Sequence, residues 1–384
     1  MKILQVAKFY PPAHGGIERV VQGLSEGAAA LGHDVRVICF HERGGADCVE
    51  NLASNLEVRR YRPDVRVGNI AASVRYLSDV QRFAREADVV HLHEPYPTGT
   101  FAGLRLPGLT ARIVTWHADV PREGPVKLAL EAMQEQLCAR VDRIICGSRG
   151  LADASRILTR FRERVSVVPL ALPLASFDPA RLDSARVSAA RERIGGRFAL
   201  AVGRLVYYKG FDLLIDAAAR TGQRVAIIGE GPLEGALRAR AEAVGVGDRV
   251  IFLKGVSDAD LPAWYAASDY FVLPSTGPAE AYGLVQVEAM ASGRPVINTA
   301  LPTGVPEVSL DGVTGLTVPP SDLDALTHAM ERLSGDDALR GRLGIAARRR
   351  AVESFSLEQV ARRHEEIYAE AIRARRGEET RSAA

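Results

Sequence analysis

The feature that most constrains this chain is a pattern of strand, glycine turn, helix and strand that occurs twice. Residues 2–7 are typical of a short buried strand, a turn at Gly15 and Gly16 follows, and apolar residues at helical spacing lead to the next predicted strand at 35–39. The same order returns from residue 198 to residue 228. A helix that joins two strands in this way makes them parallel members of one sheet, so we predict an α/β protein with two doubly wound domains. Further strands are expected at 88–92, 112–115, 143–146, 250–253, 270–273 and 295–298.

The length of 384 residues suits two such domains. A proline-rich linker that contains Pro169, Pro173 and Pro179 predicts an N-terminal domain over 1–172 and a C-terminal domain over 173–356. The charged, helical pattern from 357 to 376 is expected to pack back on the first domain. Two doubly wound domains that face each other across a cleft would place a ligand between the carboxyl ends of their sheets.

Composition and charge exclude several classes of protein. Lys plus Arg number 49 and Asp plus Glu number 47, so the net charge of +2 gives no reason to expect a nucleic-acid partner. No apolar run approaches the ~18 residues of a membrane span, and the first residues become polar too soon for a signal peptide. The four cysteines show no C-x-x-C spacing, which indicates neither a disulfide nor a metal site. We therefore expect a cytoplasmic protein.

Seven arginines lie between residues 59 and 85, interleaved with apolar side chains. They are Arg59, Arg60, Arg62, Arg66, Arg75, Arg82 and Arg85, and the apolar residues are Val65, Ile70, Val74, Leu77 and Phe83. Cations mixed with apolar groups suit an anionic membrane surface, at about 1 kcal/mol per cation. A basic face that meets only solvent explains the pattern equally well.

The loop with the richest chemistry runs from Gly203 to Gly210 and follows a predicted strand. Arg204 and Lys209 lie five residues apart in it, each beside one of these glycines. Glycines allow close backbone approach to a diphosphate, and the two cations offset the charge that develops on a departing phosphate. A solvated basic turn is the alternative.

A second candidate group begins at Glu280. Gly283 opens a predicted helix, and Glu288 lies inside that helix near its apolar side. A carboxylate there needs a partner, because an unpaired buried charge is costly. Free backbone N–H groups near 283–285 would form an anion site. Alternatively, Glu280 caps the helix and Glu288 makes an ion pair at the surface.

These motifs together resemble the family 4 retaining glycosyltransferases, whose fold is of the GT-B type. The resemblance covers nearly the whole chain and implies two Rossmann-like domains, the N-terminal one on the acceptor side and the C-terminal one binding a nucleotide sugar. It rests on the order and spacing of Gly15-Gly16, Thr115-Trp116-His117-Ala118-Asp119, Gly203-Arg204 with Lys209-Gly210, Gly229-Glu230-Gly231-Pro232, the pair Glu280 and Glu288 after Leu273-Pro274-Ser275, and residues 312–319.

The resemblance implies a role for each matching residue. Arg204 and Lys209 would hold the donor diphosphate. Glu280 would lie beside the transferred sugar, and Glu288 would contact the ribose. His117 would lie beside the donor sugar, although a histidine near a strand end is also commonly structural. The other residues expected at the donor are Gly15, Gly16, Gly203, Glu230, Lys254, Tyr282, Gly283 and Leu284.

The resemblance also implies a nucleotide-sugar donor with no separate cofactor or metal. Two D-x-D motifs, at Asp258 and Asp322, precede predicted helices, where Ser257, Asp258, Ser321 and Asp322 are expected to serve as caps. Residues 207–210 and 301–307 resemble enzymes that add mannose or rhamnose from GDP-sugars to bacterial surface polysaccharides. We therefore expect GDP-mannose or a related nucleotide sugar as donor, and a glycan or lipid-linked glycan as acceptor.

Other functions of the same architecture remain open at this point. A UDP-sugar-dependent transferase would have the same fold. A sugar-nucleotide epimerase would need further acid–base carboxylates in the N-terminal domain, and a phosphorylase would need a longer chain with a cofactor lysine. A two-lobed sugar-binding protein would need an export signal, which argues against that class.

Overall fold

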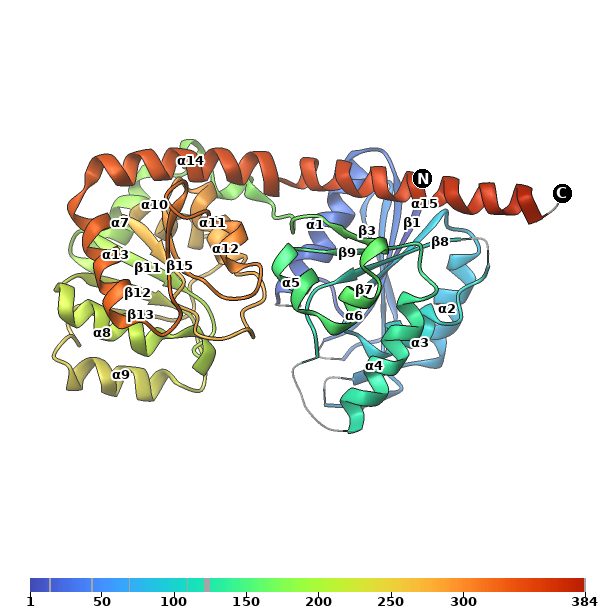
Figure 1. The fold of residues 1–384 in the computed structure, drawn as a ribbon, viewed down its shortest axis with the longest axis horizontal. Helices are drawn as coiled ribbons and strands as arrows, with labels where there is room; N and C mark the ends of the chain where they lie inside the picture. The colour runs from blue at the N-terminus through green and yellow to red at the C-terminus, as the bar shows by residue number, and fades with distance from the viewer. Residues whose placement is uncertain (14, 43, 69, 109, 121–124, 383–384) are drawn as a thin grey trace. The chain divides into compact units, whose positions relative to one another are not determined.

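A computed structural model describes residues 1–13, 15–42, 44–68, 70–108, 110–120 and 125–382. The chain divides into two compact units: unit 1 comprises Met1–Leu172 with Leu357–Ala384, and unit 2 comprises Pro173–Ser356. Each unit has its own central sheet and its own apolar core (Figure 1).

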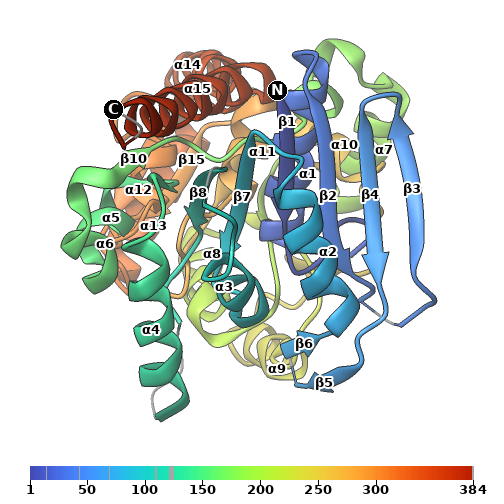
Figure 2. The ribbon, with the colours of Figure 1, turned by 90° about the vertical axis from the view of Figure 1, so that its right-hand side faces the viewer.

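Unit 1 is built on an eight-stranded sheet in the order β10-β9-β8-β7-β1-β2-β4-β3. Figure 2 shows β7, β1, β2, β4 and β3 side by side in this order. Neighbouring strands are parallel except at the edge, where β3 runs antiparallel to β4. A separate hairpin joins β5 to β6. The strands are β1 (Lys2–Val6), β2 (Asp34–Phe40), β3 (Cys48–Ala53), β4 (Leu56–Tyr61), β5 (Val65–Val67), β6 (Ile70–Ala72), β7 (Val89–Glu94), β8 (Ala111–Trp116), β9 (Arg143–Cys146) and β10 (Val165–Val167).

The last helix of the chain, α15 (Leu357–Ser382), packs on α1 and β8 of unit 1. Gly27 of α1 permits this contact, because a Cβ there would lie 2.9 Å from the Cβ of Ala361. The other helices of unit 1 are α1 (Gly16–Ala30), α2 (Val74–Ala84), α3 (Pro97–Gly103), α4 (Pro125–Cys138), α5 (Arg149–Ala154), α6 (Arg156–Arg160) and the 3-10 helix η1 (Arg162–Arg164).

Unit 2 has a six-stranded parallel sheet in the order β13-β12-β11-β14-β15-β16. Chain order reverses between β11 and β14, which is the switch point of a doubly wound sheet. The strands are β11 (Phe198–Val202), β12 (Arg224–Ile228), β13 (Val250–Leu253), β14 (Tyr270–Val272), β15 (Val296–Thr299) and β16 (Gly315–Val318). The helices are η2 (Leu174–Phe177), η3 (Pro179–Arg181), α7 (Ser184–Ile194), η4 (Tyr207–Lys209), α8 (Phe211–Thr221), α9 (Glu234–Ala243), α10 (Leu261–Ala267), α11 (Val285–Ala291), α12 (Val305–Val308), α13 (Leu323–Gly335) and α14 (Asp337–Phe355).

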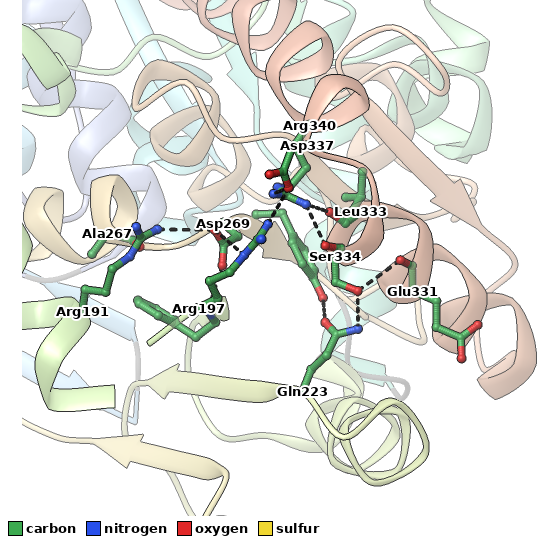
Figure 3. A network of polar contacts seen from close by, with 12 residues as sticks. Arg191, Arg197, Gln223, Ala267, Asp269, Glu331, Leu333, Ser334, Asp337 and Arg340 are labelled. Carbon is green, nitrogen blue, oxygen red and sulfur yellow. Dashed lines mark hydrogen bonds and ion pairs between the residues drawn. The ribbon is translucent and has the colours of Figure 1, made fainter. Parts of the chain in front are cut away.

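A network of polar contacts closes the amino ends of β11 and β14 in unit 2. Figure 3 shows Asp269 between Arg191 and Arg197. One oxygen of Asp269 accepts the backbone N–H of Phe198 at 3.0 Å, and the other lies 3.3 Å from the guanidinium of Arg191. Arg197 continues the network to Asp337, at 2.8 Å. This end of the sheet is therefore held together by charge, opposite the end where ligands bind in such folds.

Every strand that the sequence predicts is present, whereas several short strands were not predicted. The antiparallel edge strand β3 is exposed at five of its six positions and so has no apolar alternation to reveal it. Helix α15 extends to Ser382, beyond the expected end at residue 376.

Candidate functional site

The candidate site lies where β11 and β14 of unit 2 end side by side. The loop after β11 contacts the loop after β14 at Gly210, because a Cβ on Gly210 would lie 2.1 Å from the carbonyl oxygen of Pro274. Gly210 also has a φ of +65°, which only glycine adopts readily. The backbone N–H of Thr276 donates to the carbonyl of Tyr208 at 2.8 Å. The main chain thus brings the predicted cationic loop against the segment that leads to Glu280.

Lys209 and Glu280 form an ion pair at this junction. Lys209 Nζ lies 2.5 Å from Glu280 Oε2, and both side chains are only 10% exposed. Ser275 Oγ donates to the same carboxylate oxygen at 3.0 Å. Glu280 therefore does not cap a helix, and the loop is not merely a solvated basic turn.

Arg204 differs from Lys209 in its surroundings. Its side chain is exposed, and within the described part of the chain no hydrogen bond or ion pair engages it. Gly203 lies under the other cation, because a Cβ at this position would be 3.3 Å from Lys209 Nζ. The site therefore holds one paired cation, fixed in place, and one cation available to an anion.

Backbone N–H groups add a second positive feature beside Glu280. Gly283 has a φ of +71°, and a Cβ there would meet the side chain of Leu273 at 2.5 Å. Among the described residues, the N–H groups of Gly283 and Leu284 find no acceptor. The side chain of Tyr282 is buried and packs edge-on against the ring of Phe355.

Glu288 is buried and does not make the alternative surface ion pair. Its residue is 2% exposed, and Glu288 Oε2 accepts the hydroxyl of Tyr265 at 2.7 Å. Tyr265 comes from α10, so the carboxylate is anchored from a neighbouring helix. A buried carboxylate held in this way is oriented before any ligand arrives.

The two residues expected near the base have different environments. Lys254 pairs with Glu234 of α9 at 2.8 Å, a partner that the sequence did not predict. Glu230 is exposed, and its side chain makes no hydrogen bond or ion pair to a described residue. The carbonyl of Glu230 accepts the N–H of Leu205 at 2.9 Å, which joins the loops after β11 and β12.

Two further residues, which sequence reasoning missed, form hydrogen bonds that hold the main chain next to Gly283 in place. Gln286 Nε2 donates to the carbonyl of Tyr282 at 3.2 Å, and Asn298 Nδ2 donates to Gln286 Oε1 at 2.9 Å. The N–H of Gly304 donates to the carbonyl of Ala281 at 2.8 Å. A signal was present in the sequence, since Gln286 and Asn298 interrupt otherwise apolar runs.

Three predicted residues belong to unit 1. Gly15 is the N-cap of α1 and Gly16 is its first residue, and a Cβ on Gly15 would clash with the carboxylate of Glu18. His117 follows β8, is 8% exposed, and has its Nε2 3.1 Å from His93 Nδ1. Its ring therefore has a structural partner as well as a small accessible surface.

The D-x-D motifs lie at helix starts. Asp322 caps α13 by accepting the N–H of Ala325 at 2.9 Å, as predicted. The expected cap of α10 by Ser257 or Asp258 is wrong in detail. Helix α10 begins at Leu261 with Asp260 as its N-cap, and the Ser257 hydroxyl accepts the N–H of Asp260, which lies before the helix. Within the described ranges, no group of three or more His, Cys, Asp or Glu residues is arranged to hold a metal ion.

The arginine-rich stretch of unit 1 divides into structural and exposed members. Arg60 is buried and donates to Glu50 and to two backbone carbonyls, so it is not available to a membrane. Phe83 is buried as well, with Arg36, Arg59 and Arg82 over its ring. Arg62, Arg66 and Arg75 remain exposed, beside the exposed apolar side chains of Val65, Val67, Ile70 and Val74. No helix in the described part of the chain is both long and apolar enough to cross a bilayer.

Comparisons with known proteins match both units. Residues 14–175 match the family described as "Glycosyltransferase Family 4", and residues 188–350 match "Glycosyl transferases group 1". The O-antigen chain mannosyltransferase C of Escherichia coli is 30% identical over 372 residues, which are 96% of this chain and 98% of that protein. The chain belongs to glycosyltransferase family 4. It is therefore an enzyme of the hexosyltransferase class.

Two further relatives of this glycosyltransferase span most of its length. The D-rhamnosyltransferase WbpZ of Pseudomonas aeruginosa is 32% identical over 339 residues, covering 87% of this chain and 86% of that protein. A GDP-mannose-dependent alpha-(1-6)-phosphatidylinositol monomannoside mannosyltransferase of Mycolicibacterium smegmatis is 33% identical over 376 residues, covering 92% and 94%. The solved sucrose-phosphate synthase of Thermosynechococcus elongatus matches with a TM-score of 0.76 and 23% identity, over 97% of this chain and 99% of that one. The fold is GT-B, as the resemblance to family 4 implies.

Proposed function

We propose that this glycosyltransferase takes mannose, or a closely related hexose, from a GDP-sugar and transfers it with retention of configuration. The acceptor in this proposal is a glycan or lipid-linked glycan of a bacterial surface polysaccharide. The observation that carries it is the Lys209–Glu280 pair at the switch point of the unit 2 sheet, with the exposed cation of Arg204 in the same loop. Relatives named for mannose, rhamnose and GDP-mannose support the sugar and the nucleotide.

In the proposed reaction, negative charge grows on the diphosphate as the bond to the sugar breaks. Lys209 and Arg204 face this charge, and the N–H groups of Gly283 and Leu284 add oriented dipoles. A cation directed at such a leaving group stabilises it by roughly 3–4 kcal/mol. Glu280 has two tasks here, because it holds the ammonium of Lys209 and lies beside the transferred sugar.

Glu288 accepts hydroxyl groups of the ribose in this proposal. Its orientation is supported by the hydrogen bond from Tyr265. The resemblance to family 4 assigns Gly15, Gly16, Gly203, His117 and the main chain of Tyr282 to the donor as well, and these assignments are part of the same proposal.

The environments of Glu230 and Lys254 support guanine over uracil. Lys254 is neutralised by Glu234, whereas the exposed carboxylate of Glu230 has no partner among the described residues. A carboxylate accepts hydrogen bonds only. Guanine offers it two adjacent N–H donors, and uracil offers one. Two hydrogen bonds to one carboxylate hold a base more tightly than a single one, which favours guanine.

Thermal-shift titration with GDP and UDP tests the donor. GDP should raise the melting temperature at concentrations where UDP has little effect, because a ligand that binds only the folded state stabilises it. Glu230→Gln should reduce the difference between the two nucleotides, with Glu242→Gln on the exposed face of α9 as a matched control. A larger shift with UDP would overturn the choice of nucleotide. Anomeric NMR signals of the sugar product from GDP-mannose then decide between retention and inversion.

We also propose that the exposed residues of the β5–β6 hairpin and the start of α2 contact an anionic membrane surface. Val65, Val67 and Val74 are 59%, 70% and 78% exposed, an unusual degree for valines that lie close together in sequence. Arg62 and Arg66 supply exposed cations in the same segment. Wild-type protein should float with anionic liposomes at low salt, and Val67→Asp should float less. Equal flotation of both proteins, or none at all, would exclude this surface.

A further inference from the structure

Four histidines form a buried column inside unit 1. His91 and His93 lie on one face of β7, His117 follows β8, and His364 comes from α15. The rings of His91 and His93 stack with their centroids 4.5 Å apart, and those of His93 and His117 stack at 5.3 Å. A column of this kind is more than apolar packing, because both nitrogens of His91 and of His93 have hydrogen-bond partners, although His364 Nε2 has none among the described residues.

The partners of His93 determine where its proton lies. His93 Nε2 is 2.8 Å from Gln5 Oε1, and an amide oxygen can only accept a hydrogen bond. The proton of His93 is therefore on Nε2, which leaves Nδ1 as an acceptor. His117 Nε2 lies 3.1 Å from that Nδ1 and so must be the donor. The proton of His117 is on Nε2, and its Nδ1 carries a free lone pair.

The surroundings keep these rings neutral and leave the hydrogen bonds from Gln5 through His93 to His117 intact. Burial lowers the pKa of His117 to about 3, and it lowers the pKa of His93 and His91 well below the ordinary value. His91 does not compete for His93, because its own nitrogens pair with Tyr368 Oη at 2.6 Å and Thr115 Oγ1 at 2.7 Å. His117 can therefore act as a neutral acceptor and not as an acid at neutral pH.

We propose that Gln5 and His93 are positioning residues that hold His117 as the Nε2–H tautomer, so that its Nδ1 accepts a hydrogen bond from a hydroxyl group of the sugar. This inference rests on the proposed function, which assigns His117 to the donor sugar. His117 is 8% exposed, whereas His93 and Gln5 are more deeply buried, at 3% and 0%. The two inner residues therefore act on the substrate only through His117.

Nitrogen-15 NMR of the histidine rings tests the tautomer without any substrate. His117 in the wild-type chain should show a protonated Nε2 and an unprotonated Nδ1. Gln5→Leu removes the acceptor that orients His93, so His117 should become a mixture of tautomers. Thr115→Val is the matched control, because it removes the hydrogen bond between Thr115 Oγ1 and His91 Nε2 in the same column, and no contact of the Thr115 side chain with Gln5, His93 or His117 is present among the described residues. A wild-type His117 protonated on Nδ1, or an unchanged tautomer in Gln5→Leu, would overturn the proposal.

A double-mutant cycle with GDP-mannose then tests the link to the sugar. Gln5→Leu should lower kcat/KM about fivefold in the wild-type background, the effect of one hydrogen bond, and should have almost no effect in a His117→Ala background. An equal loss in both backgrounds would mean that Gln5 has only a structural role. If the wild-type enzyme neither binds nor turns over GDP-mannose, the proposed donor fails, while the NMR result on the tautomer stands by itself.

Discussion

The two cations of the Gly203–Gly210 loop should respond differently to the same substitution. Lys209→Met and Arg204→Met each remove one positive charge and keep most of the side-chain length. Lys209 is buried against Glu280, whereas Arg204 is exposed and has no side-chain partner in the described ranges. Both variants should lose turnover, and only Lys209→Met should also lose stability.

The size of the stability effect follows from the burial of the pair. Breaking a buried ion pair leaves an uncompensated charge and costs about 3–5 kcal/mol. Both side chains retain 10% exposure and Ser275 still donates to Glu280, so we expect the lower end, about 3 kcal/mol. In a unit of this size that corresponds to a melting temperature lower by about 6–12 °C. The free energy of unfolding of Arg204→Met should stay within about 0.5 kcal/mol of the wild-type value.

Thermal unfolding and turnover of GDP-mannose, measured on the same preparations, give the two readouts. Each single variant should lose ~10²–10³ in turnover, since in the proposed reaction each cation faces the leaving diphosphate. The double variant Lys209→Met/Glu280→Gln should regain part of the lost stability, because no charge is left buried, but none of the lost turnover. Equal melting temperatures for the Arg204 and Lys209 variants would refute the argument from burial. Retention of more than a third of turnover in either would refute the role at the diphosphate.

Three other perturbations test separate parts of the structure. Burial raises the pKa of Glu94 to about 7, so the folded state keeps a proton that the unfolded chain releases, and the contribution of Glu94 to stability should fall by up to about 3 kcal/mol as pH rises from about 4.5 to 7. The buried histidines change stability with the opposite sign but equally in wild type and Glu94→Gln. The free energy of urea unfolding of wild type relative to Glu94→Gln should therefore fall between pH 5 and pH 8, and an unchanged difference would exclude the titration of Glu94. Glu288→Gln should weaken GDP binding about tenfold by calorimetry, whereas Glu280→Gln should mainly slow transfer; unchanged GDP affinity in Glu288→Gln would contradict the ribose contact. Asp269→Asn should lower the free energy of unfolding by about 2 kcal/mol, because Asp269 accepts a backbone N–H and pairs with two guanidinium groups. Asp337→Asn should lower it by less than about 0.5 kcal/mol, because the Asp337 side chain is 76% exposed. Similar melting temperatures for the two variants would count against the network of Figure 3.

The parts of the fold that the sequence predicts are those in which local pattern and tertiary environment agree. Strands such as 198–202 are buried on both faces and therefore read as continuous apolar runs. Loops that follow such strands lie at one edge of a parallel sheet, so Arg204 and Lys209 could be assigned to the ligand edge without coordinates. The GT-B fold and the family were implied by the resemblance of the ordered motifs, in loops of both units, to glycosyltransferase family 4.

The parts that the sequence did not predict depend on partners distant along the chain. Glu288 looked able to form a surface pair, because nothing near it in sequence indicates Tyr265 of α10. Lys254 looked available to a base, but Glu234 of another helix neutralises it. Side-chain partners between elements are decided by packing, and the spacing of residues within one element carries no information about them.

Main-chain hydrogen bonds between loops form a frame for the candidate site of unit 2. The N–H of Leu205 donates to Glu230, that of Thr276 to Tyr208, and that of Gly304 to Ala281. These bonds join the loops that follow β11, β12, β14 and β15 at one edge of the sheet. Backbone bonds of this kind survive side-chain substitution, so relatives can change the residues that recognise a base or a sugar without losing the frame. This explains how one fold can accept different nucleotide sugars, and why the choice of donor must be argued from individual side chains.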